Sequence, residues 1–174
     1  MGETHSRKLL GIYLNDHLAA AAGGVDLARR LAQGYSRSDD AERLGRLADD
    51  IAADRGALLS IMRSLGCPIR RYKSLAVWTA EKVGRLKLNG GLLHRSPLSD
   101  VVELEALSLG VTGKLAGWRT LLAVAEQEPG LDIGQLRMLQ TRANDQLTVL
   151  EQLRAAAVGE VFGAAEAPDP RQDT

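Results

Sequence analysis

Residues 44–65 read LGRLADDIAADRGALLSIMRSL, and this stretch decides the fold. Its apolar side chains recur every three or four residues, a spacing that places them on one face of a helix. The row consists of Leu44, Leu47, Ile51, Asp54, Leu58, Ile61 and Leu65. An unpaired charge in such a row is costly to bury. We therefore expect a facing helix to supply Asp54 with a cationic or hydrogen-bonding partner.

The same periodicity extends along most of the chain. It predicts four long helices, at about 7–33, 39–66, 97–127 and 132–161. Capping residues support these limits: Asp39, Ser96 and Asp132 are suited to helix starts, and Gly66 is suited to a helix end. Because alternating strand patterns and hairpin turns are missing, we expect an all-α fold.

The connections between the segments predict their topology. Short connections follow the first and third helices, so each pair should form an antiparallel hairpin. About 30 residues separate the second helix from the third, enough to travel the length of a bundle, and they include a shorter predicted helix at about 73–88. We assign residues 1–163 to one domain and expect 164–174, which hold two prolines and few apolar residues, to be a disordered tail.

In helix number, helix length and central crossover, the chain resembles the ferritin-like superfamily over about residues 7–161. The resemblance implies a four-helix bundle of two hairpins with a short fifth helix in the crossover. Members of that group often hold two metal ions through Glu-x-x-His motifs. Here the residues three before His17 and His94 are Leu14 and Gly91, so no such motif exists and no metal ligand is carried over.

A reduced polar cluster remains as an alternative. Four ionisable residues fall near the middle of their helices, namely His17, Asp50, Asp54 and Glu105. Imidazole and carboxylate groups suit iron, manganese or zinc, so these four predict a site for one such ion. We favour a structural interpretation, in which His17 and Asp54 pair with each other, or with Lys114, Arg119 or Arg142, and no cofactor is bound.

A row of small residues forms one face of the third predicted helix. It contains Gly110, Gly113 and Gly117. Glycine inside a helix costs about 1 kcal/mol relative to alanine, so some feature should compensate. Close packing under Trp78 or a neighbouring helix is the interpretation that we favour, and a ligand groove is the alternative.

The central crossover is basic. Between residues 69 and 95, seven cations face Glu81 alone, a net charge of plus six in a chain that is neutral overall. The cations are Arg70, Arg71, Lys73, Lys82, Arg85, Lys87 and Arg95. We expect them to pair with acidic residues of the same bundle. The alternative is an anionic partner such as nucleic acid or a membrane surface.

Composition narrows the class of protein further. The single cysteine, Cys67, cannot form an internal disulfide, and the first residues lack the apolar core of a signal peptide, so we expect a cytoplasmic location. No apolar run approaches the roughly 20 residues needed to span a bilayer. The sequence therefore predicts a non-catalytic bundle that acts by binding or by self-association as a homo-oligomer, with a metal-dependent oxidoreductase or metal carrier as the alternative.

Overall fold

A computed structural model describes residues 2–35, 40–70 and 97–163. These residues form four helices and no strand: α1 at Gly2–Gly34, α2 at Ala41–Ser64, α4 at Pro97–Val124 and α5 at Ile133–Phe162. The predicted all-α class is therefore confirmed. None of these helices has a stretch apolar and long enough to cross a membrane.

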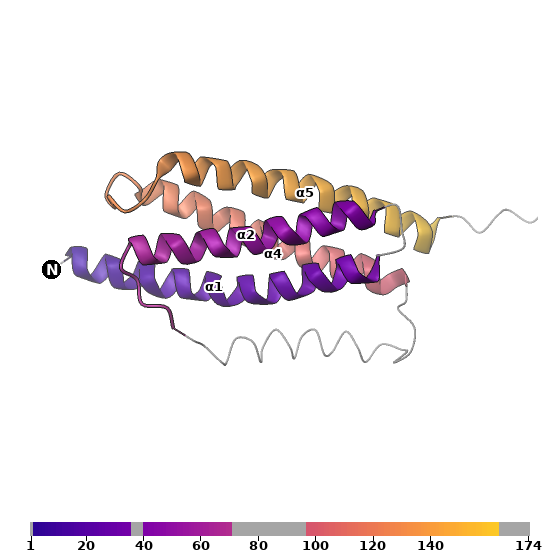
Figure 1. Cartoon of the computed structure of the whole chain (residues 1–174), viewed down its shortest axis with the longest axis horizontal. Coiled ribbons are helices and arrows are strands. Elements are labelled where there is room, and N and C mark those ends of the chain that lie inside the picture. Colours follow the sequence, from indigo (N-terminus) through magenta and orange to yellow (C-terminus); the bar gives the residue numbers. More distant parts are fainter. Residues whose placement is uncertain (1, 36–39, 71–96, 164–174) are drawn as a thin grey trace, which may run out of the picture.

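The four helices lie side by side in a bundle (Figure 1). Helix α1 packs against α2 and α4, and α4 packs most extensively against α5. The chain direction reverses between α1 and α2 and again between α4 and α5, whereas α2 and α4 run in the same direction. The connection between α2 and α4 includes residues 71–96, so the crossover and the helix at 73–88 lie outside the described residues, as does the predicted tail at 164–174.

The end of α2 follows its sequence signal. Gly66 has φ +64°, which is the left-handed conformation that glycine adopts without strain. The N–H of Gly66 donates to the carbonyl of Arg63 at 3.0 Å, and the N–H of Cys67 donates to the carbonyl of Met62 at 2.8 Å. This pair of bonds is a Schellman motif, which satisfies carbonyls that the helix leaves unpaired.

The other helix boundaries agree with the sequence to different degrees. At the start of α5, the Asp132 side chain accepts a bond from the N–H of Gln135 at 3.1 Å, as expected for a cap. Asp40 precedes α2 but its side chain makes no capping bond, and it accepts from Arg43 instead. The predicted caps Asp39 and Ser96 lie outside the described residues.

Two helix limits differ from the sequence prediction by three residues or more. Helix α1 begins at Gly2, earlier than the predicted residue 7. Helix α4 ends at Val124, three residues before the predicted limit of 127. Beyond Val124 the N–H groups of Ala125 and Gln127 bond to the carbonyls three residues back, so the chain tightens into turns.

The core runs along the inside of all four helices. Every member of the row from Leu44 to Leu65 is buried, including Asp54, which is 1% exposed. Leucines dominate the facing positions, with Leu104, Leu107 and Leu121 on α4 and Leu136 on α5 essentially inaccessible. Each such side chain contributes roughly 1.5–3 kcal/mol through burial, so leucine packing holds the helices together.

Candidate functional site

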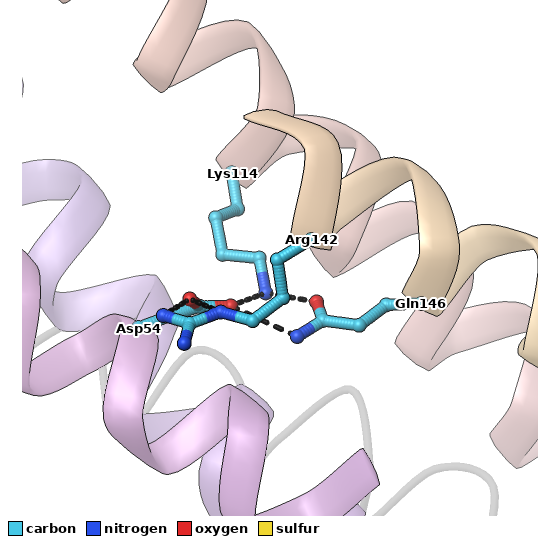
Figure 2. A network of polar contacts seen from close by, with 4 residues as sticks. All are labelled: Asp54, Lys114, Arg142 and Gln146. Atoms are coloured by element: carbon cyan, nitrogen blue, oxygen red, sulfur yellow. Dashed lines mark hydrogen bonds and ion pairs between the residues drawn. The ribbon is translucent and has the colours of Figure 1, made fainter. Parts of the chain in front are cut away.

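Asp54 is the centre of a polar network that links three helices (Figure 2). Its Oδ2 atom accepts from Lys114 Nζ at 2.5 Å and from Gln146 Nε2 at 3.0 Å. Its Oδ1 atom accepts from Arg142 Nε at 2.8 Å and also from Arg142 Nη2. Lys114 donates a second bond to Gln146 Oε1. Both oxygens of the carboxylate are thus satisfied from α4 and α5.

The network places one anion against two cations. The Asp54 side chain is fully buried, whereas those of Lys114 and Arg142 keep 16% and 29% exposure. Burial lowers the pKa of Lys114, and the neighbouring Asp54 carboxylate works in the opposite direction. Two cations share the Asp54 carboxylate, and the nearby carboxylate of Asp50 also acts to raise the pKa of Lys114.

These contacts confirm part of the pairing expected for Asp54. Lys114 and Arg142 are two of its three expected cationic partners, and the third, Arg119, is exposed and makes no contact with it. The alternative partner, His17, forms no bond with Asp54 among the described contacts. The His17 ring is half-buried and lies edge-on to Tyr13 on the same helix, with ring centroids 4.4 Å apart.

The four-residue cluster predicted as a metal site is not assembled. Asp50 and Glu105 are both exposed, and the nearest cation to Glu105 is Arg154, at 3.9 Å. Four residues turn a helix by about 400°, so Asp50 is rotated by about 40° from Asp54 and lies at the edge of the buried face. Across residues 2–35, 40–70 and 97–163, no three His, Cys, Asp or Glu side chains lie close enough together to hold a metal ion.

An open groove of about 500 Å³ lies beside this network, between α1, α2 and α4. Small residues from two helices make it wide: Ala20, Ala21 and Gly24 on α1, and Gly110, Gly113 and Gly117 on α4. Asp54 and Lys114 contribute to its inner wall. The rest of the lining is mostly apolar, so the groove combines an apolar surface with a few polar groups.

The glycine row predicted on α4 divides into two parts. A Cβ atom added at Gly117 would lie 3.2 Å from the His17 ring, so this position provides close packing between α1 and α4. A Cβ atom added at Gly110 or Gly113 would meet nothing within 4 Å. Trp78, the predicted cover, lies outside the described residues. In the part of the chain that the structure describes, Gly110 and Gly113 therefore face open space.

Two N–H donors in the groove lining have no acceptor among the residues that the structure describes. Trp118 is 2% exposed, and its Nε1 atom has no hydrogen-bond partner among the described residues. The Nε atom of Arg55 is also buried and has no hydrogen-bond partner in the described part of the chain. Burial lowers the pKa of His17, which also lines the groove, while nearby Asp16 opposes this effect.

Sequence reasoning missed two buried polar residues. Gln146 is 3% exposed and lies three residues after Ala143 and four before Leu150, so the spacing that identified Asp54 also marks it. Asn15 is 2% exposed, and its Nδ2 donates to the carbonyls of Gly11 and Pro68 while its Oδ1 accepts from the N–H of Arg70. Nothing in the sequence marks the contacts with Pro68 and Arg70, because these backbone groups lie more than 50 residues away from Asn15.

Comparisons with models of protein families, with curated proteins and with solved structures found no match to this chain.

Proposed function

We propose that this chain is a non-catalytic helical-bundle protein of ferritin-like topology that binds a small, largely apolar molecule in the groove between α1, α2 and α4. The observation that carries the proposal is the groove itself, about 500 Å³ in volume and lined mainly by apolar groups. Ligand sites in proteins are typically concave, mostly apolar and roughly 300–1,000 Å³ in volume. The groove has these properties.

The glycines on the wall of the groove support the same function. Each glycine inside α4 costs about 1 kcal/mol relative to alanine, yet Gly110 and Gly113 have no close neighbour among the described residues. Packing therefore explains Gly117 but not the other two. A bound molecule in contact with the bare helix surface would compensate for their cost.

The surrounding contacts hold the walls in place. The Asp54 network fixes α2 against α4 and α5. On the other side, the hydroxyl groups of Tyr13 and Thr120 are 3.1 Å apart, which ties α1 to α4 beside the groove. A largely pre-formed site of this kind loses little entropy when it binds a ligand.

The two alternative functions have less support. The candidate metal ligands His17, Asp50, Asp54 and Glu105 do not converge, although stoichiometric iron, manganese or zinc in the purified protein would restore that alternative. Of the seven cations proposed for an anionic macromolecule, Arg70 is the one within the described residues.

A groove-filling substitution tests the proposal. We expect the wild-type protein to bind the neutral fluorescent probe N-phenyl-1-naphthylamine, and Gly113→Leu to weaken this binding by about ten-fold or more because leucine would occupy the groove. Gly56 provides the matched control, since it lies in α2 outside the groove and a Cβ there also meets nothing within 4 Å. Gly56→Leu should leave binding unchanged, and circular dichroism should show both variants folded. Equal binding by the Gly113→Leu variant and the wild type would refute the proposal.

A further inference from the structure

We infer that the ligand of this groove is an amphipathic monocarboxylate, with an apolar body along the glycine and alanine walls and a carboxylate directed to Arg55 and Trp118. The inference rests on the proposed function and specifies its ligand. It is based on two donors that have no acceptor among the described residues and on the positive charge of Arg55.

The indole of Trp118 requires an acceptor. Indole nitrogen is a donor only, and buried N–H groups in folded proteins are nearly always paired. Trp118 is 2% exposed, and its Nε1 atom has no partner in the described residues. A ligand oxygen in the groove would satisfy it once a small shift of the indole exposes the Nε1 atom, which is shielded from solvent in the free protein.

Arg55 also needs an acceptor, and it carries a positive charge. Its guanidinium group is a permanent cation that only donates, and its buried Nε has no acceptor within the described ranges. The adjacent Asp54 is fully engaged by Lys114, Arg142 and Gln146 on the other helices. A carboxylate ligand would supply both an acceptor and the opposite charge, which makes the strongest class of hydrogen bond.

The charges around the groove favour a single anion. The lining contains two cations, Lys114 and Arg55, and two carboxylates, Asp54 and Asp16. Lys114 is paired with Asp54, whereas Arg55 forms no ion pair within the described residues. Asp16, the other carboxylate of the lining, is exposed and therefore well solvated. The remaining lining includes Leu14, Leu107 and Leu121, which offer a charged ligand apolar contact but no acceptors or donors.

Titration calorimetry with decanoate, below its micelle concentration, tests the ligand class, and decanol serves as a neutral ligand of the same chain length. We expect decanoate to bind more tightly than decanol. We expect Arg55→Met to weaken decanoate binding by about ten-fold or more, because it removes a charged hydrogen-bond donor, and to leave decanol binding unchanged. Arg63→Met is the matched control, since Arg63 lies on α2, is exposed and does not line the groove. It should change neither affinity.

The possible outcomes distinguish a failure of the proposed ligand class from a failure of the proposed groove binding. Equal affinities for decanoate and decanol, both unaffected by Arg55→Met, would overturn the ligand class and leave groove binding intact. The ligand class would also be overturned, and groove binding left intact, if decanoate did not bind while Gly113→Leu still weakened naphthylamine binding. If naphthylamine does not bind either, both proposals fail. Naphthylamine binding that appears only after Trp78→Ala would show that the chain fills its own groove, and this result would also overturn the inference.

Discussion

Asp54 shows how one residue can organise an apolar interior. A carboxylate that is 1% exposed is tolerated because its two oxygens accept four hydrogen bonds from three side chains. Removing one member of a buried ion pair is more damaging than replacing the whole pair, because the remaining charge is left buried and unpaired.

We expect Asp54→Leu to reduce the free energy of unfolding by about 3 kcal/mol, since it leaves Lys114 and Arg142 uncompensated. The double variant Asp54→Leu, Lys114→Met should cost clearly less than the sum of the two single variants. Urea denaturation of the four proteins measures this coupling. Strictly additive effects would mean that the carboxylate and the lysine do not interact.

His17 should make stability depend on pH. Burial lowers its pKa from the ordinary value of 6.5 in the folded state. The unfolded chain therefore binds more protons than the folded chain just below pH 6.5, so stability is complete above that pH and falls as the pH drops through the folded-state pKa. Thermal unfolding between pH 7.5 and 5.5 should show this loss.

The matching variants identify the residue responsible. His17→Gln should flatten the decline in stability. His5→Gln should retain it, because His5 is exposed on the same helix. A decline that persists unchanged in the His17→Gln variant would assign the effect to other groups.

At the scale of the helices, local sequence patterns are sufficient to predict much of the fold. The row around Ile51, the stop at Gly66 and the cap at Asp132 are encoded within a few residues, and the structure agrees with each. Partners in space were harder to predict. Asp54 was correctly given a cationic partner, but the orientation of His17 depends on how α1 packs against Gly117, and one sequence does not determine that register.

Asn15 is the clearest contact between distant segments. Its side chain bonds to the backbone of Pro68 and Arg70 beyond the end of α2, so it fixes this part of the chain to α1. We expect Asn15→Ala to reduce the free energy of unfolding by about 1–3 kcal/mol, because buried backbone groups lose their partners.

Asn144 offers a matched control for this substitution. Both asparagines donate to the carbonyl four residues earlier in their helix, but Asn144 is exposed and its side chain bonds to no other segment of the described chain. Asn144→Ala should be neutral or slightly stabilising, since alanine favours helix. Comparable losses in chemical denaturation of both variants would contradict a bridging role for Asn15.

At the scale of the whole molecule, the bundle has a filled interior and an incompletely filled face. Leucines and the Asp54 network occupy the space between α2, α4 and α5, whereas small residues leave a groove between α1, α2 and α4. The same helix, α4, serves both purposes: Gly110 and Gly113 leave the groove open, while the buried side chains of Leu107 and Leu121 belong to the core and also line the groove.

The indole resonance of Trp118 tests the account most directly. The chain has two tryptophans, so Trp78→Phe leaves one indole N–H signal in a nitrogen-15 correlation spectrum. We expect saturable addition of decanoate to move this signal downfield as Nε1 gains an acceptor, and the change to be lost with Gly113→Leu. A signal that stays fixed at concentrations of decanoate that saturate the calorimetric titration would contradict the proposed groove.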